Sequence, residues 1–142
     1  LEDFERTMAV NVRAVFVASQ AAVRHMGDGG RIVSIGSCLA DRVPSAGMTL
    51  YSMSKSALSA FTRGLARDLG PRGITVNVVQ PGSTDTDMNP ADGAHAEEQR
   101  GRMAIKRYGD ASNIAGMVAW LASEEGRFAN GAAYTIDGGA NA

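Results

Sequence analysis

Tyr51 and Lys55, a tyrosine and a lysine four residues apart, are the pair of residues in this sequence best suited to proton chemistry. A helix is predicted over Leu50–Leu69, so the phenol and the ammonium group stand one turn apart on a common face. A nearby ammonium group favours the phenolate form of a tyrosine, which makes its hydroxyl a usable proton donor and acceptor. Taken alone, the pair equally fits a surface lysine packed on a ring.

Hydrophobic periodicity predicts three helices, and the second of them contains this pair. A helical stripe crosses roughly the first 26 residues, and a second stripe makes the central helix over Leu50–Leu69, which ends at Gly70-Pro71. A last helix is capped by Asp110 or Ser112 and buries Ile114, Met117, Val118 and Leu121. Between them, residues 83–106 predict a mobile loop with little to bury and a short polar helix near His95–Met103.

Three short β-branched runs bounded by glycine predict buried strands over Arg31–Ser37, Gly73–Val79 and Ala132–Ile136. We expect the second strand to be ended by the run Gln80-Pro81-Gly82. The alternation of helix and strand predicts an α/β fold with three parallel strands and helices on both faces, half of a doubly wound sheet. With 142 residues, the chain is expected to form one domain.

Composition excludes several classes of partner. The 14 basic and 15 acidic residues give a net charge of −1, so neither nucleic acid nor an acidic membrane is an expected partner. No apolar run approaches the roughly 20 residues of a membrane span, and no metal-ligand spacing is present. A single cysteine, Cys38, excludes an internal disulfide and fits a reducing cytoplasm.

The predicted topology gathers the reactive side chains at one edge of the sheet. Ligands of such sheets bind beyond the carboxyl ends of the strands, where Ser37 ends the first strand and Pro81-Gly82 follows the second. The loop from Cys38 to Leu50 is long enough to bring Tyr51 back over the end of the first strand. A serine hydroxyl, a phenol and an ammonium group are therefore expected to converge.

These residues, in this order, resemble the short-chain dehydrogenase/reductase family, closest to its 3-oxoacyl-carrier-protein reductase branch. The resemblance covers essentially the whole chain and rests on Ser37, Tyr51-x-x-x-Lys55, the run Arg72–Gly82 and the closing run Thr135–Gly139. It implies a Rossmann-like sheet and an NAD(P)-dependent oxidoreductase that interconverts a ketone and a secondary alcohol. The implied cofactor is NAD(H) or NADP(H), the partners are a small-molecule carbonyl or alcohol and further copies of the chain, and the assembly is a homodimer or homotetramer.

The resemblance also implies roles for individual residues. Tyr51 would exchange a proton with the substrate oxygen, Lys55 would hold the nicotinamide ribose, and Ser37 would hydrogen-bond the substrate oxygen as charge develops. Asn11, at the position of the family's helix asparagine, would hold a water that links Lys55 to solvent. The segment along the nicotinamide would be formed by Pro81, Gly82, Thr84 and Thr86.

Some features depart from the family pattern. The spacing from Ser37 to Tyr51 is one residue longer than is common, which predicts a bulged loop, and Thr84 replaces a usual aliphatic residue. No glycine-rich phosphate-binding turn follows a strand here. The resemblance therefore implies that residues 1–142 are the C-terminal half of a single dinucleotide-binding domain, inactive when isolated.

Two other functions remain open at this point. Epimerases and dehydratases of the family's extended branch share the Tyr–Lys pair, and a non-catalytic structural or oligomerisation module would need no chemistry. The closing Asp137-Gly138-Gly139 and the strand that runs into Pro81-Gly82 argue against the first, and the intact set of Ser37, Tyr51 and Lys55 argues against the second.

Overall fold

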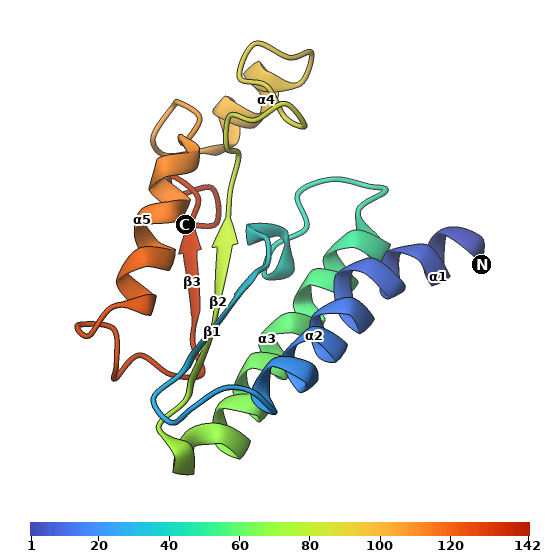
Figure 1. Ribbon diagram of the computed structural model, residues 1–142. Helices are drawn as coiled ribbons and strands as arrows, with labels where there is room; N and C mark the ends of the chain where they lie inside the picture. Colours follow the sequence, from blue (N-terminus) through green and yellow to red (C-terminus); the bar gives the residue numbers. More distant parts are fainter.

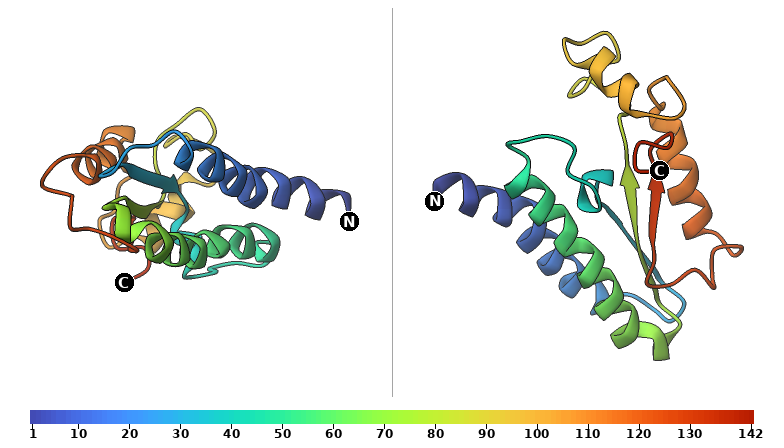
Figure 2. Two further views of the ribbon diagram at one scale, coloured as in Figure 1. Left: turned by 60° about the horizontal axis from the view of Figure 1, so that its bottom comes forward. Right: turned by 180° about the vertical axis from the view of Figure 1, so that it is seen from behind.

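The computed structural model describes residues 1–142 and contains one sheet of three parallel strands in the order β1-β2-β3 (Figure 1). The strands are β1 (Arg31–Ile35), β2 (Thr75–Pro81) and β3 (Ala133–Ile136). Helices α2 and α3 lie on one face of the sheet and α5 lies on the other (Figures 1 and 2). The predicted doubly wound α/β architecture is thereby confirmed.

The first helical stretch is interrupted by a wider turn that the sequence pattern does not predict. It comprises α1 (Glu2–Met8), the π-helical turn η1 (Ala9–Arg13) and α2 (Ala14–Val23). Such turns are rare and occur often at functional sites. The stretch ends at Val23, about three residues before the predicted end, where the Arg72 guanidinium donates to the carbonyl oxygens of Val23 and Met26.

Helix α3 (Thr49–Leu69) is found within one residue of its predicted range. Its inner face buries a stripe against β2, and Ala66 and Leu69 pack there with Ile74 and Val76. A 3-10 turn, η3 (Gly70–Arg72), follows, and Gly73 then adopts a left-handed φ of 65°. Because this conformation suits glycine and not a strand, β2 begins at Thr75 and not at Gly73.

Strand β2 extends two residues beyond its predicted end at Val79, through Pro81, which pairs with Ile136, and it ends within the run Gln80-Pro81-Gly82 as expected. Proline is tolerated because no residue of β1 is paired opposite its missing N–H. The last residue pair between β1 and β2 joins Ile35 to Val79. The opposite side still pairs with β3, where the Gly82 N–H donates to the Ile136 carbonyl at 2.9 Å.

Two fully buried amides tie β2 to its surroundings. The Asn77 side chain donates to the Ala129 carbonyl at 2.7 Å and accepts the Ala132 N–H at 3.2 Å. The Gln80 side chain donates to Ser59 of α3 at 3.3 Å and accepts from Thr135 of β3 at 3.0 Å. Because a buried amide is costly unless it is paired, these bonds fix α3 and β3 relative to the strand between them.

The segment between β2 and α5 forms a small unit that protrudes beyond the sheet (Figure 1). It contains α4 (Ala96–Arg102), close to the predicted short helix, and is followed by α5 (Ala111–Ala122) with Asp110 as its N-cap. The expectation that this segment has little to bury is wrong, because Ala96, Met103 and Tyr108 form a buried cluster. The predicted stripe of α5 is half-buried apart from Leu121, which is fully buried.

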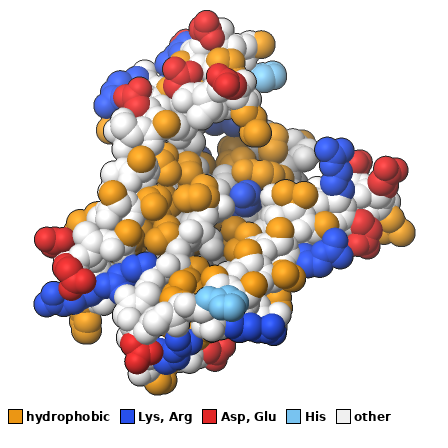
Figure 3. All heavy atoms as spheres, viewed as in Figure 1, with side chains coloured by type: hydrophobic (Ala, Val, Ile, Leu, Met, Phe, Trp, Pro, Cys, Tyr) orange, Lys and Arg blue, Asp and Glu red, His pale blue; other side chains and the backbone are white.

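Strand β1 has a neighbour on one side only. It pairs with β2, and Ile35 at its end is 48% exposed. On the face seen in Figure 3, hydrophobic side chains gather in the hollow between α5 and the helices α2 and α3. The open side of β1 is therefore bordered by apolar surface. No helix of the structure is both long and apolar enough to cross a membrane.

Candidate active site

Two hydrogen bonds join the start of α3 to the segments directly before and after Ser37. The Lys55 ammonium donates to the Ile35 carbonyl at 3.3 Å, two residues before Ser37. The Ser56 hydroxyl donates to the carbonyl of Ala40, three residues after it. These bonds hold the tyrosine–lysine turn of α3 against the carboxyl end of β1, where the sequence places the reactive groups.

Ser37 lies just beyond β1, as the N-cap of the 3-10 turn η2 (Cys38–Ala40). The Gly36 N–H still donates to the Val79 carbonyl at 2.7 Å, so the strand's pairing reaches almost to the serine. The Ser37 hydroxyl accepts the Leu39 N–H at 3.2 Å and is buried. Accepting this bond leaves the hydroxyl proton free to be donated to a ligand.

Tyr51 and Lys55 share one face of α3, with the Lys55 nitrogen 5.8 Å from the centre of the Tyr51 ring. The Tyr51 side chain remains accessible, since it is 38% exposed. Burial lowers the pKa of the Lys55 ammonium below its usual value, because a charged group loses hydration inside the protein. The pair thus presents a reachable phenol beside a partly desolvated cation.

Replacing Lys55 with methionine in the natural protein is expected to remove a rise in thermal stability at alkaline pH. The unfolded chain binds more protons than the folded one between the lowered pKa of Lys55 and the ordinary value of 10.5, so the wild type gains stability as pH rises through that window. The variant has no such group, and it also lacks the bond to the Ile35 carbonyl at every pH. The Tm of the wild type relative to the variant should therefore rise from pH 7 to pH 11. A relative Tm that stays flat or falls over this range would contradict the expectation.

Asn11 lies in the π-helical turn and reaches the first turns of α3. Its amide donates to the Ser54 hydroxyl at 3.0 Å, and Ser54 in turn donates to the Tyr51 carbonyl at 2.7 Å. Ser54 is completely buried, so this relay fixes the backbone that carries Tyr51. The Asn11 side chain thus makes its hydrogen bond neither to its own helix nor to Lys55. The water that we expect it to hold, between Lys55 and solvent, remains a prediction.

Ser54 was not singled out in the sequence, although it directly precedes Lys55. The partner of its hydroxyl depends on how the first helical stretch packs against α3, and that packing includes a π-helical turn without a sequence signal. Two serines, Ser52 and Ser54, lie between Tyr51 and Lys55, and the sequence offers no signal that distinguishes one from the other.

The segment after β2 contains the residues expected along the nicotinamide. A Cβ atom at Gly82 would lie 2.6 Å from the Cα atom of Asp137, so only glycine allows this close approach to the end of β3. The Thr84 hydroxyl donates to the Gly82 carbonyl at 3.1 Å. Thr86 is exposed, and its hydroxyl accepts the Asn89 N–H at 3.2 Å. With Pro81, these residues form the first part of the segment that leads from β2 to α4.

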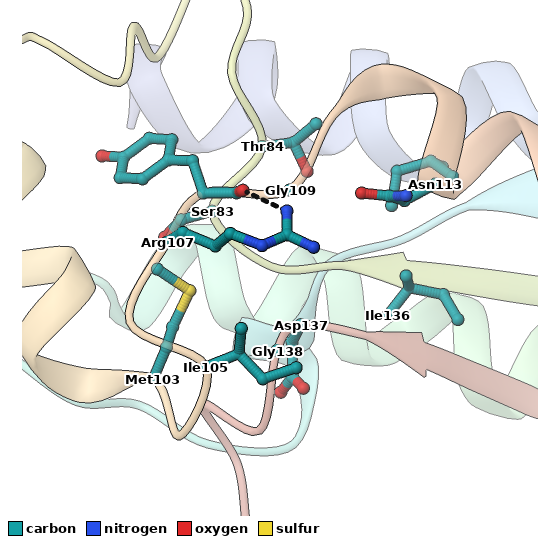
Figure 4. Close-up of a pocket in the computed structure, with 12 residues that line it drawn as sticks. Ser83, Thr84, Met103, Ile105, Arg107, Gly109, Asn113, Ile136, Asp137 and Gly138 are labelled. Atoms are coloured by element: carbon teal, nitrogen blue, oxygen red, sulfur yellow. Dashed lines mark hydrogen bonds between the residues drawn. The ribbon is translucent and has the colours of Figure 1, made fainter.

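A cavity of about 250 Å³ lies beyond the ends of β2 and β3 (Figure 4). Thr84 is the only predicted site residue that lines it; Ser37, Tyr51 and Lys55 do not. Arg107 extends across the pocket and donates to the Tyr108 carbonyl at 3.3 Å. Because the pocket wall offers no paired acid and base, we place the candidate active site at the Ser37–Tyr51–Lys55 set.

Other reactive side chains of the chain do not form a competing site. No group of three or more His, Cys, Asp or Glu side chains lies in an arrangement that could hold a metal ion. Burial, followed by the negative charge of Asp137, raises the pKa of the Cys38 thiol. A raised pKa keeps this thiol protonated near neutral pH, which disfavours a nucleophilic role.

The chain is similar in sequence to a known protein family and to several known proteins. Residues 1–141 match a protein-family model described as Enoyl-(Acyl carrier protein) reductase. The chain is 55% identical over 137 residues to the cyclic-di-GMP-binding biofilm dispersal mediator protein of Escherichia coli K12, covering 96% of this chain and 58% of that protein. It is 40% identical over 152 residues to the short chain dehydrogenase/reductase AacuN of Aspergillus aculeatus, covering 98% of this chain and 58% of that protein.

The chain is also similar to solved structures, both in sequence and in fold. A short chain dehydrogenase from Burkholderia cenocepacia J2315 in complex with NADP is 69% identical, with a TM-score of 0.99 over 100% of this chain and 58% of that one. A blue fluorescent protein from a metagenomic library, in complex with NADPH, is 60% identical, with a TM-score of 0.99 over 100% of this chain and 57% of that one. The chain thus spans somewhat under three fifths of the length of these similar proteins.

Proposed function

The chain belongs to the short-chain dehydrogenase/reductase family, and from this premise we propose that the natural protein containing it is an NAD(P)-dependent oxidoreductase that interconverts a ketone and a secondary alcohol. The proposal rests on the two hydrogen bonds that hold the Tyr51–Lys55 turn of α3 against the chain on both sides of Ser37, at the end of β1. This arrangement joins a proton donor, a hydroxyl that polarises a carbonyl, and a cation.

In the reducing direction, Tyr51 donates its phenolic proton to the carbonyl oxygen as negative charge develops there, and it removes that proton in the oxidising direction. Ser37 donates a hydrogen bond to the same oxygen, and this bond strengthens as the charge grows. Asn11 and Ser54 keep the Tyr51 backbone in place from beneath. When bound, NAD(P)H supplies the hydride to the carbonyl carbon, and the ketone becomes a secondary alcohol.

The donors of the site fit a nicotinamide cofactor. Lys55 has three N–H donors and uses one on the Ile35 carbonyl, so two remain for the hydroxyls of a ribose. No ion pair ties the Lys55 ammonium to a carboxylate of the chain. Pro81 ends the neighbouring strand β2, and Gly82, Thr84 and Thr86 follow it, so we assign their backbone and hydroxyl groups to the carboxamide of the nicotinamide. The similar structures that hold NADP or NADPH support the same cofactor here.

We also propose that residues 1–142 form the C-terminal part of a single dinucleotide-binding domain whose further parallel strands pair with β1. The one-sided pairing of β1 and the apolar hollow beside it support this arrangement.

Within the family, the run Arg72–Gly82 and the closing Thr135–Gly139 favour the 3-oxoacyl-carrier-protein reductase branch. The single cysteine favours a cytoplasmic location.

The epimerase or dehydratase alternative and the non-catalytic alternative gain no particular support from the geometry. Assay of the natural protein with NADPH and NADH against panels of ketones and secondary alcohols tests the proposal. We expect nucleotide oxidation that depends on a ketone and yields the alcohol. Nucleotide binding without turnover of any carbonyl compound would contradict the assignment and favour a non-catalytic role.

For the assembly, we propose a homodimer or homotetramer that pairs the first helical stretch of two copies. Val10 and Val17 of this stretch are more than half exposed, and so is Phe16, whose ring packs against Phe61 of α3; a groove of about 340 Å³ runs beside Met8, Val12 and Phe16. Exposed apolar patches of this kind mark protein contacts.

Replacing Val17 with glutamate is therefore expected to shift the natural protein to a smaller species in sedimentation velocity, because the new carboxylate would be buried without a partner. Ala94→Glu places the same charge on an exposed loop near α4 and should leave the assembly unchanged. A wild-type monomer at micromolar concentration, or a Val17→Glu protein that sediments like the wild type, would contradict this interface.

A further inference from the structure

The last residues of the chain fold back over the turn that follows Ser37. Strand β3 ends at Ile136, and Asp137 then closes a tight loop through Gly138 and Gly139, whose φ angles of 63° and 78° are left-handed. The Asp137 carboxylate accepts the N–H of Gly139 at 2.9 Å and the N–H of Asn141 at 3.0 Å. Because both carboxylate oxygens are used, the orientation of Asn141 is fixed from within the tail.

The oriented tail bonds to the segment after β1 at two points. The Asn141 amide donates to the Cys38 carbonyl at 2.7 Å. The Arg42 guanidinium donates to the Ala140 carbonyl at 2.6 Å. These contacts join residues about a hundred positions apart in the sequence; one is made to the 3-10 turn η2 itself and the other to Arg42, two residues after it.

The first of these contacts lies directly beside the candidate catalytic serine. Cys38 follows Ser37, and its carbonyl also accepts the Asp41 N–H that closes η2. On the other side of the turn, Ser56 of α3 holds the Ala40 carbonyl. Helix α3 and the tail therefore hold η2 from two directions, and Ser37 is the residue that caps it.

We propose that Asn141 is a positioning residue for Ser37: its side-chain amide, on a backbone held by the Asp137 carboxylate, holds η2 so that the Ser37 hydroxyl faces the substrate oxygen. The inference rests on the proposed function of Ser37. Asn141 itself touches no reacting atom. A hydroxyl that must meet an oxygen within a few tenths of an ångström depends strongly on how firmly its backbone is held.

Two substitutions, one without and one with the side-chain N–H donor, test the role of Asn141 in the natural protein. Asn141→Asp keeps the size of the side chain, removes the donor and adds a negative charge, while Asn141→Gln keeps the neutral donor on a side chain one methylene longer. We expect Asn141→Asp to lower kcat roughly 10- to 100-fold, the range expected for a misplaced catalytic group, with KM for NADPH within about twofold of wild type. Asn141→Gln should recover most of kcat.

The discriminating measurement is the same substitution in a protein that lacks the Ser37 hydroxyl. If Asn141 acts through Ser37, Asn141→Asp should cost little further activity in the Ser37→Ala background. An undiminished loss of kcat in that background would overturn the proposal, because Asn141 would then act elsewhere. If Ser37→Ala alone leaves kcat unchanged, the proposed function of Ser37 fails first, and the positioning role fails with it.

Hydrogen exchange provides a readout that is independent of activity. The Leu39 and Asp41 amides, which bond within η2, should exchange faster in Asn141→Asp than in wild type, while amides of β2 should be unaffected. Equal protection of η2 in the two proteins would overturn the proposed contact, even if the kcat of Asn141→Asp is low.

Discussion

Replacing Tyr51 with phenylalanine in the natural protein is expected to lower kcat by about 10²- to 10⁴-fold, the range associated with loss of a general acid. The substitution removes only the hydroxyl, and the ring that stands beside the Lys55 ammonium is retained. Affinity for NADPH, measured by fluorescence titration, should therefore stay within about twofold of wild type. The loss should appear in kcat and not in cofactor binding.

Tyr134→Phe is the matched control for this experiment. Tyr134 lies in β3, where its ring packs edge-on against Trp120 at 6.4 Å, and it belongs to no part of the candidate site. Removing its hydroxyl should leave kcat unchanged. A Tyr51→Phe protein that retains most of its activity would show that another group transfers the proton.

Replacing Ser37 with alanine is expected to lower kcat by about 10²- to 10³-fold, because a hydrogen bond to the developing oxyanion is lost. Ser37→Ala also removes the acceptor for the Leu39 N–H at 3.2 Å, so part of the loss could arise from a loosened turn. Ser37→Thr separates the two effects, since it restores both a donor and an acceptor at the same position. We expect Ser37→Thr to recover a substantial part of kcat, as measured under saturating ketone and NADPH. Equal loss in both variants would contradict a role for the hydroxyl.

The parts of the site that are close in sequence could be predicted, because they depend on local periodicity. The spacing of Tyr51 and Lys55 on one helix face follows from the 3.6-residue repeat, and α3 is found within one residue of its predicted range. Ser37 could be placed at the end of a strand because glycine and β-branched residues mark β1. These predictions required no knowledge of how the helices pack.

The remaining features depend on contacts between distant segments, which a single sequence does not specify. The end of β2 at Pro81 depends on β1 stopping first, so the proline could not be assigned to the strand from its own neighbourhood. The bond from Asn11 to Ser54 requires a π-helical turn, and the bond from Asn141 to Cys38 requires the tail to fold over η2. The buried cluster of Ala96, Met103 and Tyr108 likewise forms only once the segment after β2 folds on itself.

Transfer of a hydride between a nicotinamide and a carbonyl carbon is the step on which the proposed function depends. NADPH deuterated at C4 on one face or the other, used in two separate reactions with a ketone substrate and followed by mass spectrometry of the alcohol, tests this step. We expect one of the two cofactors to give an alcohol with a single deuterium on the carbinol carbon, and the other to give unlabelled alcohol. Unlabelled product from both cofactors, with deuterium released to water or kept on the nucleotide, would rule out direct hydride transfer.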